Sequence, residues 1–194
     1  GLSRRRCKRL CRTSFAEMSA ELEHRKALLA GAYAYLSEVT PLRYDCGALC
    51  GAACCKENES HGGEDECGLL LLPGEKELLS GEDYAFLPKE SGVLAVCGGD
   101  CRRDMRPFAC RIFPYYPKIT RAAGRFAIDL RPDPRAERIC PILWEKRRRK
   151  VRVDFLRAAR KAVRLLLTDE KLREELLSQS DMLSDIERLR ARLR

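Results

Sequence analysis

The chain has 194 residues, of which 45% are hydrophobic and 35% are charged, and it carries 11 cysteines and a formal net charge of +9. This hydrophobic fraction excludes a chain that is disordered throughout, and the length suits a single domain with a helical appendage. No stretch approaches the roughly 20 consecutive apolar residues that a membrane-spanning helix needs. We therefore expect no membrane partner.

The positive charge is concentrated at the two ends of the chain. Residues 1–17 carry +5 and residues 141–194 carry +7, whereas residues 18–140 carry −3. The sequence therefore does not predict general nucleic-acid affinity for the central part. Within it, residues 18–100 carry −9 and residues 101–140 carry +6, so we expect these two parts to attract each other on folding.

The first 17 residues are rich in arginine and have no apolar periodicity, and a regular helical pattern begins only at Met18. We expect residues 1–17 to be a basic extension that is either non-native or disordered. Ser14 and Glu17 match a capping box, however, which would let the first helix start earlier. Because Cys7 and Cys11 lie in this extension, we do not count them among the candidate ligands.

An amphipathic helix is predicted over residues 18–37, and Thr40 followed by Pro41 should end it. Between residue 69 and residue 134 the pattern predicts only short elements. These are a strand at 69–72, a short helix at 75–79, a strand at 93–96, and a hairpin that turns at 122–124 and is closed by Pro132, Asp133 and Pro134.

The C-terminal part, residues 144–194, is predicted to be basic and helical. Its apolar residues Trp144, Val151, Phe155, Ala162 and Leu166 are spaced by seven, four, seven and four positions, which indicates one face of a long helix. Thr168 and Asp169 should break that helix. Ser184 and Glu187 match a capping box and predict a last short helix.

Cysteines gather in three regions of the central domain, residues 18–143: the first is residues 46–55, the second is residues 97–101 followed by Cys110, and the third is Cys140 alone. We expect spacings of four residues on a helical turn to align the sulfur atoms of the first region in one stripe. The candidate metal ligands are Cys46, Cys50, Cys54, Cys55, Cys97, Cys101, Cys110 and Cys140. Eight thiolates suit two tetrahedral zinc sites or a larger shared cluster, including an iron–sulfur cluster.

The other candidate ligands are weaker. We interpret Cys67 as a small buried residue, His61 as a solvated loop residue and His24 as a surface residue. An odd number of cysteines suits a disulfide framework poorly, and clustered thiols in a reducing cytosol are more often metal ligands. We therefore expect a cytoplasmic protein.

Positive charge accompanies the second cysteine region. Two sites of four thiolates each around zinc would carry a formal charge of about −4, which a protein interior must compensate. Arginines at 102, 103, 106 and 111 alternate with these cysteines. We assign the shaping and charge balance of the site to Arg106, Pro107, Arg111 and Phe113.

Three motifs together resemble the zinc- or iron-chelating cysteine-cluster family of the YkgJ type, to which the flagellin lysine N-methylases are related. They are Cys50-Gly-Ala-Ala-Cys54-Cys55, Arg106-Pro107 before Cys110-Arg-Ile-Phe-Pro, and Cys140-Pro141. The resemblance covers roughly residues 35–145 and implies metal chelation. This chain has three residues between Cys50 and Cys54 where the family commonly has two, which leaves open whether Cys54 or Cys55 is the ligand.

The sequence thus predicts an α+β fold: a small, irregular, cysteine-rich domain with short strands, stapled by metal and flanked by an N-terminal helix and a C-terminal helical segment. We expect thiolates to hold zinc or an iron–sulfur cluster, and a protein partner remains open. One alternative is an iron–sulfur enzyme related to protein lysine N-methylation, although no G-x-G-x-x-G loop is present. A second, disfavoured alternative is a metal-stapled module that binds nucleic acid through the basic run from Lys146 to Arg152.

Overall fold

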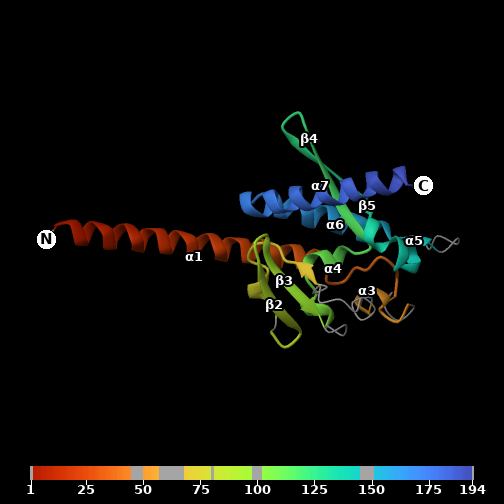
Figure 1. The fold of residues 1–194 in the computed structure, drawn as a ribbon, viewed down its shortest axis with the longest axis horizontal. Coiled ribbons are helices and arrows are strands. Elements are labelled where there is room, and N and C mark those ends of the chain that lie inside the picture. Colours follow the sequence, from red (N-terminus) through yellow and green to blue (C-terminus); the bar gives the residue numbers. More distant parts are fainter. Residues whose placement is uncertain are drawn as a thin grey trace.

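The computed structural model describes residues 2–44, 50–56, 68–79, 81–97, 102–144 and 151–193, and it describes their side chains except at 2–16, 55, 56, 138 and 144. Helices and two small antiparallel sheets make up the described part, so the predicted α+β class is confirmed (Figure 1). The division of the chain at residues 17 and 143 stays a prediction.

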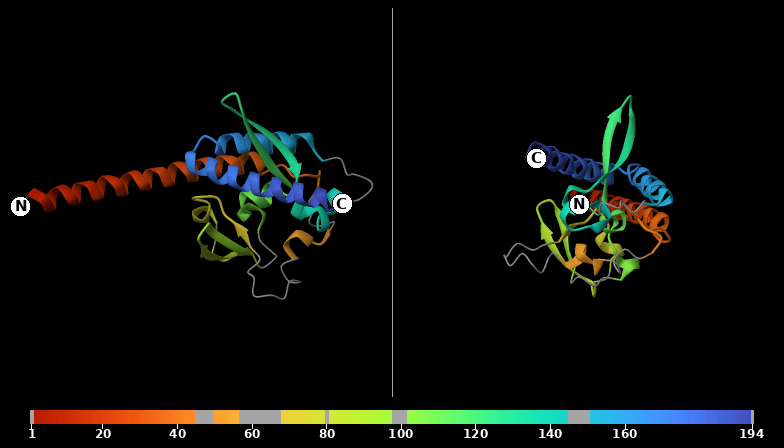
Figure 2. Two further views of the ribbon diagram at one scale, coloured as in Figure 1. Left: turned by 45° about the horizontal axis from the view of Figure 1, so that its top comes forward. Right: turned by 90° about the vertical axis from the view of Figure 1, so that its right-hand side faces the viewer.

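The first helix, α1 (Leu2–Leu36), is longer than expected. It begins at Leu2, earlier than both Met18 and the capping box predicted at Ser14, so neither of these residues starts the helix. Its N-terminal part projects beyond the rest of the described structure (Figures 1 and 2). The helix ends at Leu36, one residue before the predicted end at residue 37. Leu29, Ala32 and Leu36 are buried on its inner face.

Helix α6 (Val153–Leu166) packs along α1 and contributes the centre of the main hydrophobic core. Its buried residues are Phe155, Ala159, Ala162, Val163 and Leu166. Gly31 on α1 leaves room for Leu165 of α6, because a Cβ atom at this position would lie 2.9 Å from a methyl carbon of Leu165 and would displace it. The helical contact thus depends on small residues facing large ones.

The prediction of one long helix from Trp144 is wrong. A short helix, α5 (Pro141–Trp144), precedes the gap in the description, and the non-helical residues Val151 and Arg152 come before the start of α6. Arg152 is extended, with a ψ of 130°. Its backbone N–H donates to the carbonyl oxygen of Pro41 at 3.0 Å, so a contact with the loop after α1 competes with helix formation there.

The last helix, α7 (Glu170–Arg192), begins where the break was predicted. Asp169 caps it by accepting a hydrogen bond from Leu172 N at 3.0 Å. The predicted second break at Ser184 is wrong. Ser184 is buried inside the continuous helix, where its hydroxyl lies 3.4 Å from that of Tyr116. The serine that the sequence pattern assigned to a helix cap therefore makes a tertiary contact.

The first sheet has the order β1–β3–β2, with strands β1 (Leu69–Leu70), β2 (Tyr84–Lys89) and β3 (Gly92–Cys97). Two of these strands and the short helix η2 (Lys76–Leu78) were predicted. Strand β2 was not, and its Pro88 is the kind of residue that weakens a strand pattern. Because β2 is an edge strand, Pro88 is tolerated there.

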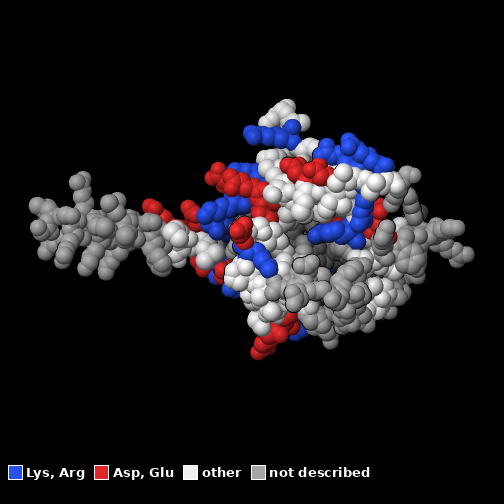
Figure 3. Space-filling view, viewed as in Figure 1, with Lys and Arg blue, Asp and Glu red and all other residues white. Residues whose placement is uncertain are grey.

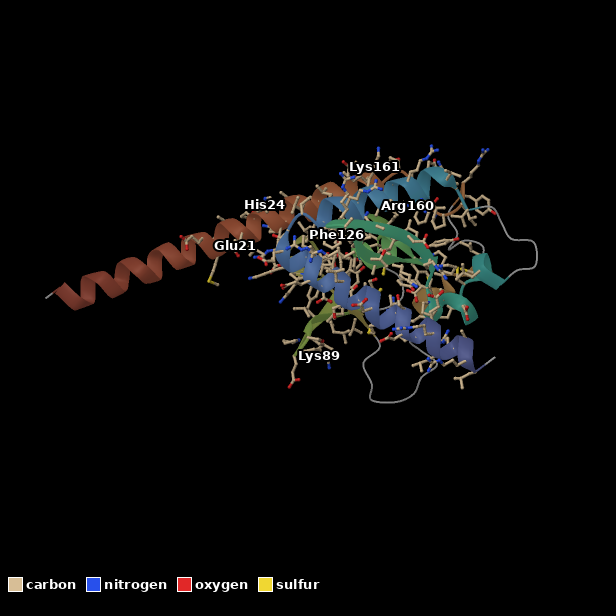
Figure 4. All side chains as sticks on the ribbon, turned by 90° about the horizontal axis from the view of Figure 1, so that it is seen from above. Glu21, His24, Lys89, Phe126, Arg160 and Lys161 are labelled. Atoms are coloured by element: carbon tan, nitrogen blue, oxygen red, sulfur yellow. The ribbon has the colours of Figure 1, made fainter. Side chains whose placement is uncertain are left out.

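The second sheet is the predicted hairpin of β4 (Tyr115–Ala122) and β5 (Arg125–Pro132). Ala123 and Gly124 form its turn with φ values of 50° and 73°, the left-handed backbone that tight hairpin turns require. The hairpin lies between α6 and α7 and its tip extends beyond them (Figures 2 and 4). Ser180 on α7 accepts a hydrogen bond from Ile119 N at 2.8 Å and so joins the helix to the sheet.

We expect the Asp169→Ala variant to lose about 1 kcal/mol of unfolding free energy, because the cap of α7 is removed. Asp169→Asn keeps a capping oxygen and should lose less. Urea denaturation followed by circular dichroism measures both variants. Equal losses for Ala and Asn would contradict a capping role, since both also lose the ion pair with Arg25 at 3.6 Å.

Candidate functional site

The base of the β4–β5 hairpin brings together two segments that carry predicted ligands. Tyr115 pairs with Pro132, and Asp133 N donates a hydrogen bond to the carbonyl oxygen of Pro114 at 2.9 Å. Helix α4 (Phe108–Ile112), with Cys110, precedes this base. The short helix η4 (Pro134–Arg138) follows it and leads to Cys140.

An ion pair between a buried carboxylate and an exposed arginine lies at this base. The Asp133 carboxylate, with a side chain only 2% exposed, accepts hydrogen bonds from Arg135 N, Nε and Nη2 at 2.8, 3.0 and 2.6 Å. Burial lowers the pKa of Arg135, but the bonds and charge of Asp133, with a smaller contribution from Cys110, raise it overall. The Arg135 guanidinium is thus held in place by the Asp133 carboxylate.

Cys140 belongs to a small buried cluster with Leu42, Ala136 and Ile142. Its backbone N–H donates to the carbonyl oxygen of Ala136 at 2.8 Å, which ties it to η4. Leu42 precedes Cys46 by four residues. The chain segment that leads to the first cysteine region therefore packs, through Leu42, against Cys140, which is the third region.

Arg111 connects α4 to the short helix η3 (Arg103–Met105), which follows the second cysteine region. Its Nε donates to the carbonyl oxygen of Arg106 at 2.7 Å and its Nη2 to that of Asp104 at 2.5 Å. The guanidinium also lies 4.0 Å from the ring centroid of Tyr33. Met105 and Cys97 pack against one hydrophobic cluster, so η3 stays near the end of β3.

A second buried carboxylate, that of Glu75, ties three elements together. Its Oε1 accepts hydrogen bonds from Tyr33 Oη and Phe108 N, both at 2.5 Å, and its Oε2 accepts one from Leu72 N at 2.9 Å. Burial raises the pKa of Glu75 although these bonds lower it, and burial with the nearby Glu75 charge raises the pKa of Tyr33. Glu75 thereby holds the first turn of α4, on which Cys110 lies.

The predicted helical stripe does not continue from Cys50 to Cys54, whereas its first member, Cys46, lies outside the described residues. Gly51 and Ala52 adopt φ values of 60° and 56°, so the backbone turns between Cys50 and helix α3 (Ala53–Lys56). The left-handed conformation breaks the helical spacing on which the stripe depended. Cys50 is half-buried and Cys54 is exposed.

The eight predicted ligands divide between described and undescribed parts of the chain. Cys97 is half-buried, Cys110 is exposed and Cys140 is buried. Cys46 and Cys101, like Cys67 and His61, lie outside the described residues, as does the side chain of Cys55. Among the described residues no group of three or more His, Cys, Asp or Glu side chains is arranged to hold a metal ion.

Of the residues assigned to shaping the site, Arg111 fixes η3 to α4, and Pro107 lies at the start of α4. Phe113 packs against the cluster of Cys140. Sequence reasoning missed Asp133, Arg135 and Glu75. The Pro-Asp-Pro motif indicated a turn only, and nothing near Glu75 in the sequence indicates that its carboxylate is buried.

No family model, curated protein or solved structure matches this chain. Within the described residues, none of the helices is both long and apolar enough to cross a membrane.

Stability should depend on pH through Glu75. Because the folded pKa lies above the unfolded one, the stabilisation by the protonated carboxyl is present at low pH and is lost as pH rises through the folded pKa. As pH rises above about 5, we expect the unfolding free energy to fall more steeply for the native chain than for Glu75→Gln. The difference between the two slopes should be at most about 1.4 kcal/mol per pH unit, the limit for one titrating group. Urea denaturation at each pH measures the two slopes.

The matched control is Glu77→Gln, since Glu77 is exposed and lies two positions away. That variant should keep the native slope. Identical slopes for the native chain and Glu75→Gln would rule out a raised pKa at Glu75.

Proposed function

We propose that the chain is a metal-binding cysteine-cluster protein whose thiolates hold zinc or an iron–sulfur cluster. The observation that carries this proposal is the hairpin base, which joins α4, with Cys110, to η4, with Arg135. The charge of Cys110 contributes to the raised pKa of Arg135, in agreement with this placement. A cation beside a thiol favours the thiolate, which is the form that binds metals.

The arrangement of the chain supports the same proposal. Three sets of contacts bring segments next to all three cysteine regions close together. They are the bond at the hairpin base, the packing around Cys140 and the hydrogen bonds of Arg111. A thiolate donor set suits zinc and iron–sulfur clusters equally. We therefore propose Cys46, Cys50, Cys54, Cys55, Cys97, Cys101, Cys110 and Cys140 as ligands, and a cytoplasmic location because thiols stay reduced there.

A structural role for the metal follows from the small size of the elements around these cysteines. Helices α3 and α4 have 4 and 5 residues, which is too few for either to be stable without tertiary contacts. Metal binding contributes directly to the folding free energy of such segments. In this proposal the metal acts as a staple, and Arg135 and Arg111 support its ligands.

The nucleic-acid alternative receives less support. Most of the basic run from Lys146 lies outside the described residues. On the face that Figure 3 shows, the described Lys and Arg side chains form separate groups with Asp and Glu among them, and no single basic face. Steep salt dependence of DNA or RNA retention would favour this alternative.

Purification without oxygen should give protein with a stoichiometric amount of bound metal. Elemental analysis gives the metal, and visible absorption distinguishes an iron–sulfur cluster from colourless zinc protein. A strong chelator should then lower helical circular dichroism and increase proteolysis, because the staple is lost. Protein that contains neither metal would contradict metal binding, and metal removal without structural change would contradict the structural role.

The Arg135→Gln variant should retain metal about tenfold less tightly, because residues that support metal ligands commonly have effects of this size. Competition with a coloured chelator measures the affinity. Arg125→Gln, on the exposed turn of the hairpin, is the matched control and should bind as the native chain does. Arg135→Lys keeps the charge and should recover part of the loss; an unchanged affinity in Arg135→Gln would exclude the role of Arg135.

A further inference from the structure

The C-terminal half of α7 exposes an unusual amount of apolar surface. Met182, Leu189 and Leu193 are 50%, 59% and 88% exposed, and Ile186 beside them is half-buried. These four residues are spaced by four, three and four positions. On a helix with 3.6 residues per turn this spacing keeps residues within about 60° of one another. Met182, Ile186 and Leu189 thus form one line, which Leu193, the residue directly after the end of α7, continues, and we call it the apolar line.

The opposite side of this half of α7 already has its contacts. Ser180, Leu183 and Ser184 are buried against the body of the protein. Glu187 accepts hydrogen bonds from Tyr116 Oη at 3.1 Å and from Arg131 Nη2 at 2.8 Å. Since these bonds fix the orientation of the helix, the apolar line cannot turn inward without breaking them.

A line of charged residues runs beside the apolar line. Asp181, Asp185, Arg188 and Arg192 have the same spacing of four, three and four, and they lie about 100° around the helix from it. The line is acidic in its first half and basic in its second. Asp185 and Arg188 pair within the chain, but both are exposed, so the pair can rearrange at little cost.

This order of charges is complementary to itself in one orientation only. When two such helices pack antiparallel about a two-fold axis, each charged line faces its own copy in reverse. Asp181 then faces Arg192 of the partner subunit, and Asp185 faces Arg188 of the partner subunit. In a parallel pair about a two-fold axis the two charged lines would lie on opposite sides of the interface, so they could not pair with each other.

We propose that the C-terminal half of α7 is a dimerisation surface that binds the same surface of a second copy of this chain, antiparallel and about a two-fold axis. The apolar lines pack against each other and the charged lines set the direction, as in a symmetric interface where one patch meets itself. Four apolar side chains per copy make a small interface, which predicts weak association with a dissociation constant of roughly 1–100 µM.

Sedimentation velocity on the reduced full chain, over about a hundredfold range of concentration, tests the proposal. The native chain should pass from monomer to dimer. Leu189→Glu should weaken dimerisation at least about tenfold, because it places a charge at the centre of the apolar contact. The matched control is Met18→Glu, an equally exposed apolar residue on α1 that should leave the dimer unchanged.

A charge exchange tests the orientation. Asp185→Arg and Arg188→Asp should each weaken the dimer about tenfold, because each sets like charges against one another across the axis. The two changes combined should restore the native affinity to within about threefold. Far-UV circular dichroism and thermal melting identify any variant that fails to fold.

A chain that stays monomeric up to about 500 µM would overturn the proposal, whatever other protein binds this face. So would a dimer that Leu189→Glu leaves intact, or a combined charge exchange that fails to restore affinity. This inference does not rest on metal binding, because the apolar and charged lines contain no proposed ligand.

Discussion

The pairing of β4 with β5 is the constraint on which the candidate site depends. Cys110 and Cys140 are far apart in the sequence, yet they flank the two ends of one hairpin. The bond from Asp133 N to Pro114 O continues the pairing beyond the last paired residues. Once the hairpin closes, α4 and η4 emerge as neighbours, and the loop after α1 packs against them through Leu42.

Two buried carboxylates stabilise what the hairpin brings together. Asp133 caps η4 and orients Arg135. Glu75 joins the first turn of α4 to Tyr33 of α1 and to Leu72, which follows strand β1. Both accept backbone N–H groups, which satisfies polar atoms that would otherwise be buried without partners. The Glu75 carboxyl joins segments distant in sequence, and the backbone N–H of Asp133 binds Pro114 across the hairpin base. Both residues therefore contribute to placing Cys110 before any metal is bound.

Helix α7 links the two proposals physically. Its Arg190 donates a hydrogen bond to the carbonyl oxygen of Pro134, in the same η4 that carries Arg135. Its outward side carries the apolar line only a few residues away. Metal content and dimerisation can therefore be measured on the same variants, and a change at Leu189 that altered metal affinity would reveal coupling through η4.

The sequence by itself determined the features that depend on local pattern: the α+β class, the hairpin with its Ala-Gly turn, the strand at 93–96 and the break before α7. Apolar periodicity and turn chemistry act over a few residues, so they can be read without the fold. Tertiary structure decided the rest. Ser184 does not cap a helix, because it is buried against Tyr116 of β4. Arg152 stays extended because its N–H binds the carbonyl oxygen of Pro41. Gly51 and Ala52 adopt left-handed backbone where a helix was expected. Glu75 could not be assigned from the sequence, because its carboxyl is buried among partners on distant segments. Asp133 and Arg135 could not be assigned either, because the fold buries the Asp133 carboxylate that holds Arg135.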